Sequence, residues 1–128
     1  MESGVVYLDT HTVIWLYDGD SDWLSKHAQR AIETGDIRIS PMVMLELQYL
    51  REIHRLKMPP DRLISELNKV IEVDVCSMPF PRIIDAAALE TWTRDAFDRI
   101  ITAHARLAGA MLITQDEKIL KAYKKALT

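Results

Sequence analysis

The sequence predicts a three-layer α/β/α domain with a central, mostly parallel sheet. Three observations lead to this fold class: the chain has 128 residues, short apolar runs alternate with longer amphipathic segments, and the first run is apolar throughout. A chain of this length suits one domain, which we expect to span residues 1–128. Strands that alternate with helices form parallel sheets covered by helices on both faces. Continuous apolar runs are typical of strands buried on both faces.

The first half of the chain defines its elements through apolar runs and helix caps. Val-Val-Tyr-Leu is a run of β-forming residues that ends at Asp9, and Ile-Arg-Ile is a brief alternating strand. Gly35 ends a helix, and Ser40 and Pro41 supply the N-cap and first residue of the next. In chain order, these signals predict a strand at 5–8, helices at 12–17 and 25–34, a strand at 37–39, and a helix from 40 to about 54.

The second half is defined by its breakers and by one long periodic segment. Two prolines, Pro59 and Pro60, interrupt the chain before an amphipathic stretch. The longest predicted helix carries apolar residues and His104 at helical spacing and ends at Gly109. In chain order, the segments predict a helix at 61–69, a strand at 71–75, helices at 84–89 and 93–107, a strand at 110–114, and a final helix at 116–124.

Composition excludes several classes of protein. Hydrophobic residues make up 48% and charged residues 27%, a balance typical of globular domains rather than disordered chains. No apolar stretch approaches the roughly 18 residues of a membrane span. The opening Met-Glu-Ser-Gly lacks the features of a secretory signal, so we expect a cytoplasmic protein. Cys76 is the only cysteine, which excludes an internal disulfide.

The net charge of −3 differs from the basic balance of many nucleic-acid-binding proteins. The positions of the acids therefore matter, because divalent ions bound by clustered acids would reverse the local field. Asp9 directly follows the first strand and Asp116 lies two residues beyond the last. Ligands of open α/β sheets bind at the carboxyl ends of the strands, where both residues lie. An N-cap is the alternative role for each.

Glu46 is the acid that is hardest to explain as a surface residue. It falls in the apolar stripe of its helix, which we expect to face the core. A buried, unpaired carboxylate is costly, so such a residue usually has a metal or a cationic partner. A buried ion pair with an arginine is the alternative. The stripe consists of Met42, Leu45, Tyr49, Leu50 and Ile53.

Two further acids, Asp95 and Asp98, lie three residues apart at the start of the long helix. This spacing places both on one helix face, away from the apolar stripe. They could belong to the same acidic site as Asp9 and Glu46. The alternative is a capping arrangement, with Asp95 as N-cap and Asp98 in the first turn, both favoured by the helix dipole.

Four segments carry a resemblance to a known family. The chain resembles PIN domains, whose acidic quartet would fall on Asp9, Glu46, Asp98 and Asp116. The third segment is similar to one found in VapC-type toxins, the toxin halves of VapBC toxin-antitoxin pairs. Ala96 stands where that subfamily usually has proline, a change of small expected cost at a first-turn position. The segments are Tyr-Leu-Asp-Thr-His-Thr at 7–12, Ser-Pro-Met-Val-Met-Leu-Glu-Leu at 40–47, Arg-Asp-Ala-Phe-Asp-Arg-Ile-Ile-Thr-Ala-His-Ala at 94–105, and Leu-Ile-Thr-Gln-Asp-Glu at 112–117.

The resemblance implies an endoribonuclease that cleaves tRNA, rRNA or mRNA with Mg²⁺, for which Mn²⁺ can substitute. Carboxylates suit this chemistry because hard oxygen ligands hold Mg²⁺ and leave waters in place. Asp9 and Asp98 would be the main ligands, Glu46 would complete the shell or orient the water, and Asp116 would bind a second ion or act through water. The residues that would support this shell are Asp95, Thr10, Thr114 and Arg99.

The resemblance also implies protein partners. A VapB-like antitoxin would inhibit the enzyme, and the chain would form a homodimer or a hetero-oligomer with that antitoxin. Its docking groove could be lined by Trp15, Trp23, Leu47 and Leu50.

Two other functions remain open at this stage. One is a catalytically inactive PIN-fold module that binds RNA or protein. The other is a phosphatase of the haloacid dehalogenase type, which also places an aspartate after the first strand. Its motif needs a second acid two residues later, where this chain has His11.

Overall fold

The computed structural model describes residues 4–128. The expectation that residues 1–3 do not begin a secretory signal concerns residues outside this range. A five-stranded sheet forms its centre, and every pair of neighbouring strands is parallel. The strand order is β3-β2-β1-β4-β5. The strands are β1 (Val5–Leu8), β2 (Asp36–Ile39), β3 (Val73–Val75), β4 (Met111–Ile113) and β5 (Ala126–Leu127).

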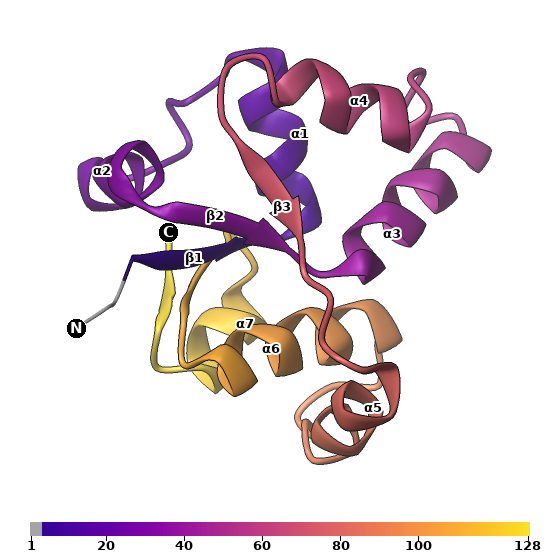
Figure 1. Cartoon of the computed structure of the whole chain (residues 1–128). Helices are drawn as coiled ribbons and strands as arrows, with labels where there is room; N and C mark the ends of the chain where they lie inside the picture. Colours follow the sequence, from indigo (N-terminus) through magenta and orange to yellow (C-terminus); the bar gives the residue numbers. More distant parts are fainter. Residues whose placement is uncertain (1–3) are drawn as a thin grey trace.

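Helices cover both faces of this sheet. Figure 1 shows α1, α2 and α4 on one side and α6 and α7 on the other. Helix α3 leaves the carboxyl end of β2 and, like α5, packs against α6. The three-layer α/β/α architecture is therefore confirmed. The helices are α1 (Thr10–Asp18), α2 (Lys26–Thr34), α3 (Pro41–Glu52), α4 (Pro60–Leu67), α5 (Phe80–Ala88), α6 (Ala96–Ala108) and α7 (Glu117–Ala122).

Several helix ends form through the residues that the sequence indicated. The Ser25 hydroxyl accepts a hydrogen bond from the backbone N–H of Ala28, at 3.1 Å, and begins α2. The Ser40 hydroxyl accepts from the N–H of Met42, at 3.0 Å, ahead of a proline in the first turn of α3. Gly109 ends α6 in the left-handed conformation, with φ of 63°. The starts of α2 and α3 and the end of α6 are thus set locally.

The core lies on both faces of the central strands. Fully buried side chains come from three of the strands and from the helices packed on them. Full burial of an aliphatic or aromatic side chain contributes about 1.5–3 kcal/mol, so this layer is the main source of stability. No helix in the described part of the chain combines the length and apolar character of a membrane span. The fully buried strand residues are Tyr7, Leu8, Ile39, Leu112 and Ile113.

The expected orientation of α3 is wrong. Leu45, Tyr49 and Ile53 are 56%, 47% and 42% exposed, although all three belong to the stripe that we expected to face the core. Of that stripe, Leu50 is buried, on a face that it shares with Val43 and Leu47. Apolar residues lie on more than one side of this helix, so the sequence pattern offers two candidate core faces. Packing against α4 and α6 selects one of them and leaves the other exposed.

Candidate active site

Five carboxylates lie around one pocket of about 300 Å³. They come from separate parts of the chain: Asp9 follows β1, Glu46 lies within α3, Asp95 and Asp98 begin α6, and Asp116 precedes α7. The pocket therefore opens at the carboxyl end of the parallel sheet, where the sequence placed it. The rest of its lining consists of Thr10, His11, Trp15, Ile101 and Gln115.

Asp9 is the most deeply buried of these acids. It caps α1, because its Oδ1 accepts a hydrogen bond from the backbone N–H of Thr12 at 3.0 Å. Its Oδ2 accepts from the Thr114 hydroxyl. Burial raises the pKa of Asp9, while the hydrogen bonds from Thr114 and Thr12 act to lower it. Asp9 therefore has both the capping role and a place in the pocket, two roles that the sequence offered as alternatives.

Thr114 connects Asp9 with Asp116 without lining the pocket itself. Leu8 pairs with Ile113 across β1 and β4, which brings the residues that follow them, Asp9 and Thr114, level with each other. The Thr114 oxygen also accepts a hydrogen bond from the backbone N–H of Asp116, at 3.0 Å. Thr114 therefore links two of the acidic residues that line the pocket.

Glu46 reaches the pocket from the boundary of the core. Its Oε1 accepts a hydrogen bond from the Thr10 hydroxyl at 2.5 Å. Burial raises the pKa of Glu46, the bond from Thr10 lowers it, and the charges of Asp95 and Asp9 raise it further. No cationic side chain is paired with Glu46 in residues 4–128, so the ion pair with an arginine is not what holds it. The residue lies in the pocket, although three members of its expected core-facing stripe are exposed.

Asp95 and Asp98 occupy the first turn of α6. The Oδ1 of Asp95 accepts a hydrogen bond from the backbone N–H of Asp98 at 3.1 Å, which makes Asp95 the N-cap. Burial, followed by the charges of Asp95, Asp116, Glu46 and Asp9, raises the pKa of Asp98 to about 7. The negative charges of all four other acids thus act on Asp98, which supports a single electrostatic cluster.

Asp116 is likewise both a cap and a pocket residue. Its Oδ1 accepts from the backbone N–H groups of Lys118 and Ile119, at 2.8 and 3.2 Å, and begins α7. The preceding residue, Gln115, also lines the pocket and donates to the backbone carbonyl of Trp23 at 2.6 Å. Sequence reasoning missed Gln115, because a neutral loop residue carries no local signal of its position.

Arg99 does not lie among the pocket-lining residues. Its guanidinium donates instead to backbone carbonyls at the end of α5, those of Ala87 and Ala88, both at 3.0 Å. This placement does not bring Arg99 into the pocket, where we expected it to support the metal shell. His11 and Trp15, which the sequence did not assign to the acidic site, do line the pocket.

The pocket has the donor chemistry that a divalent cation requires. Five carboxylates meet there, and no lysine or arginine is among the described residues that line it. Hard carboxylate oxygens are the ligands that Mg²⁺ prefers. Within residues 4–128, no three acidic, histidine or cysteine side chains form a ready-made metal cage. One reason is that Asp9, Asp95 and Asp116 each direct an oxygen at a helix N-terminus.

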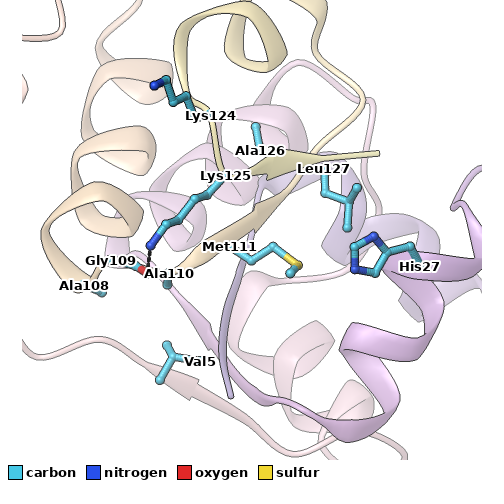
Figure 2. Close-up of a pocket in the computed structure, with 10 residues that line it drawn as sticks. All are labelled: Val5, His27, Ala108, Gly109, Ala110, Met111, Lys124, Lys125, Ala126 and Leu127. Atoms are coloured by element: carbon cyan, nitrogen blue, oxygen red, sulfur yellow. Dashed lines mark hydrogen bonds between the residues drawn. The ribbon is translucent and has the colours of Figure 1, made fainter. Parts of the chain in front are cut away.

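A more spacious cavity, about 630 Å³, lies elsewhere and has a different character. Val5 begins β1 and Met111 begins β4, so this cavity lies at the amino ends of those strands. Figure 2 shows its lining, in which the Lys125 ammonium donates to the Gly109 carbonyl at 2.9 Å. Among the described residues around it there is no carboxylate. The two cavities therefore differ in chemistry, because carboxylates line the smaller one and none is among the described residues around this one.

An α/β/α domain with an acidic pocket at the carboxyl ends of its strands carries its acids where open α/β sheets bind their ligands. A model of the PIN domain family matches residues 6–125, and the chain belongs to that family. PIN domains are generally nucleases, which supports a hydrolase that acts on nucleic acids. This membership sets aside the haloacid dehalogenase alternative. No curated protein matches the chain.

Solved structures with the same fold include three from toxin-antitoxin systems. A toxin-antitoxin complex from Klebsiella pneumoniae is 22% identical, with 96% of each chain covered and a TM-score of 0.65. VapBC2 from Rickettsia felis, bound to a DNA fragment from its promoter, is 17% identical, with 97% of each chain covered and a TM-score of 0.68. VapBC-1 from nontypeable Haemophilus influenzae is 19% identical, covering 96% of this chain and 95% of that one, with a TM-score of 0.62. At these identities the likeness establishes the fold.

Proposed function

We propose that this PIN domain is a Mg²⁺-dependent endoribonuclease that acts in the cytoplasm as the toxin of a toxin-antitoxin pair. One observation carries the proposal: five carboxylates from four segments meet in one pocket that has no lysine or arginine among its described lining. Such a cluster is electrostatically unfavourable unless protons or cations compensate it. Family membership and the fold shared with toxin-antitoxin structures support the same conclusion.

The four acids Asp9, Glu46, Asp98 and Asp116 would hold the metal, with Mn²⁺ as a substitute. Bound there, the ion would neutralise charge on the phosphoryl oxygens and lower the pKa of a bound water. The Thr114 hydroxyl keeps Asp9 oriented, and the Thr10 hydroxyl does the same for Glu46. Both hydroxyls restrict carboxylates that would otherwise be free to turn away from one another. Asp95 fixes the first turn of α6 as its N-cap and so supports Asp98.

Removal of divalent metal is the first test of this activity. The purified protein should cut total RNA in Mg²⁺, stop cutting in chelator, and resume when Mg²⁺ or Mn²⁺ is restored. Both ions should also raise the unfolding temperature, because they bind the folded state alone. Sequencing of the new RNA ends would identify the substrate. RNA binding without cleavage in either metal would instead favour the inactive binding module.

An antitoxin has a suitable docking region beside the pocket. Trp23 is 56% exposed and stacks on Trp15, which itself lines the pocket, with ring centroids 5.5 Å apart. Exposed aromatic surface next to an acidic pocket suits a partner that presents apolar and basic side chains together. An arginine near the C-terminus of a VapB-like antitoxin would neutralise the carboxylates in place of metal. Leu47 and Leu50 are buried in the core, so their expected part in a groove is wrong.

A second copy of the chain could cover the exposed apolar stripe of α3. The exposed residues meant here are Leu45, Tyr49 and Ile53, at successive four-residue intervals. Tyr49 lies against Phe97 of α6, with ring centroids 5.9 Å apart. Contiguous apolar surface of this kind marks interaction sites on soluble domains. The homodimer expected from the sequence would use this face.

The oligomeric state of a charge variant tests this face. Leu45→Arg should convert the dimer to a monomer in sedimentation velocity experiments, because a partner would have to bury the new charge. Val70→Arg is the matched control, since Val70 is 83% exposed and lies beyond the end of α4. A wild-type chain that remains monomeric at high concentration, or a Leu45→Arg chain that still dimerises, would contradict the assignment.

A further inference from the structure

Arg99 binds three backbone carbonyls and no side chain. Its Nε donates to Ala87 and its Nη2 to Ala88, both at 3.0 Å, while Nη1 donates to Thr93 at 3.5 Å. Ala87 and Ala88 are the last residues of α5, and the Ala87 carbonyl also accepts from the backbone N–H of Glu90 at 3.1 Å. One guanidinium therefore joins the end of α5, the connecting loop and the first turn of α6.

The same turn carries two acids of the pocket. Asp95 and Asp98 both line the pocket, and Arg99 is the next residue along the helix. Consecutive residues of an α-helix point about 100° apart, so Arg99 can reach α5 while Asp98 points into the pocket. Thr93 contributes to the same assembly, because its hydroxyl accepts from the N–H of Asp95 at 3.2 Å.

The first turn of α6, which carries Asp95 and Asp98, needs to be held in place. Asp95 and Asp98 line the same pocket as three further carboxylates, and like charges in one pocket repel one another. The ends of a helix are also the parts that fray. Packing of α6 on β1 and β4 fixes the body of the helix, whereas Arg99 fixes its start. A planar guanidinium can bind several carbonyls at once, and a lysine ammonium reproduces that arrangement poorly.

We propose that Arg99 is a positioning residue, which clamps the first turn of α6 to the end of α5 and so holds Asp95 and Asp98 toward the metal site. The inference rests on the proposed metal-dependent function. It differs from contact with the RNA phosphate, because the donors of Arg99 are directed at the protein backbone. Loss of the clamp should therefore weaken metal binding and turnover, with little effect on RNA affinity.

The test compares Arg99→Met, Arg99→Lys and the control Arg82→Met, which changes an exposed arginine of α5. Calorimetric titration with Mn²⁺ should show about 10-fold or greater loss of affinity for both Arg99 variants, as for other residues that orient metal ligands. With RNA, kcat should fall while KM stays near the wild-type value. Arg82→Met should match the wild type in both measurements. All titrations are made well below the unfolding temperature, so that lost stability alone leaves the Mn²⁺ affinity unchanged.

Hydrogen exchange in chelator separates this inference from the proposed function. Amides of the turn at 96–99 should exchange faster in Arg99→Met, while those at 103–105 should stay as in the wild type. A raised KM with unchanged Mn²⁺ affinity would assign Arg99 to the phosphate and overturn the proposal, as would unchanged exchange in the turn. A wild-type protein that binds no Mn²⁺ would contradict the proposed function, and the exchange data would then decide alone whether Arg99 holds the turn.

Discussion

Replacement of Asp98 by asparagine should lower RNA cleavage on the order of 100-fold, as expected when a metal ligand is lost. The same change should make the metal-free fold more stable, because it removes a charge that burial and the neighbouring carboxylates disfavour. This combination, a large loss of activity with a gain in stability, is characteristic of a residue placed for function. Cleavage of total RNA in Mg²⁺ and urea unfolding in chelator measure the two effects.

The pH dependence of this gain follows from the raised pKa of Asp98. The folded protein raises that pKa from 3.8 to about 7, so folding favours the protonated acid. The stabilising contribution is fully present below pH 4 and is lost as the pH rises toward 7. Asp98→Asn should therefore stabilise the metal-free fold by about 1–2 kcal/mol at pH 8, allowing for solvent screening, and by less at pH 5.

Asp85→Asn is the matched control for this prediction. Asp85 is exposed on α5 and does not line the acidic pocket, so its replacement should change neither cleavage nor stability appreciably. Equal effects of the two substitutions would remove Asp98 from the metal site. A gain in stability that is the same at pH 5 and pH 8 would show that the ionised carboxylate of Asp98 is not its cause.

Glu46→Gln should reduce cleavage on the order of 100-fold while leaving the metal-free fold equally stable or more stable. Glutamine keeps the shape of the side chain and can still accept the hydrogen bond from Thr10. The substitution removes a negative charge that burial and the charges of Asp95 and Asp9 disfavour. Thermal unfolding in chelator, measured beside cleavage in Mg²⁺, tests both parts.

Glu52→Gln provides the comparison on the same helix, where Glu52 is exposed and accepts from Gln48 at 2.9 Å. It should leave cleavage unchanged. If Glu46 were half of a buried ion pair, its replacement would destabilise the fold by about 3–5 kcal/mol. Such a loss together with near-normal cleavage would exclude Glu46 from the metal site.

The acids at the strand ends could be predicted because their positions depend on local signals and on one general rule of parallel sheets. Asp9 and Asp116 follow apolar strands, and ligands bind at the carboxyl ends of such strands. The sequence did not show that β1 and β4 are neighbours. It therefore could not derive the hydrogen bond between Thr114 and Asp9, which depends on that pairing.

Other features were set by packing rather than by local pattern. Glu46 was identified from a stripe expected to face the core, three members of which are exposed, because α3 has apolar residues on both candidate faces. Strand β5 was missed because it has two residues, held by backbone hydrogen bonds such as that from Thr114 N–H to Leu127 at 2.9 Å. The direction of Arg99 could have been anticipated, since the residue after Asp98 points about 100° away from it along the helix.

The most direct test of a carboxylate-based nuclease centre is cleavage of total RNA in Mg²⁺ by the wild-type protein and by Asp9→Asn, measured side by side. Asparagine remains a good N-cap, and the Thr114 hydroxyl can bond its amide group, so the fold should survive the change. We expect the wild-type protein to cut RNA and Asp9→Asn to show no Mg²⁺-dependent cleavage. Cleavage by Asp9→Asn at the wild-type rate would contradict the assignment of this pocket as the active site.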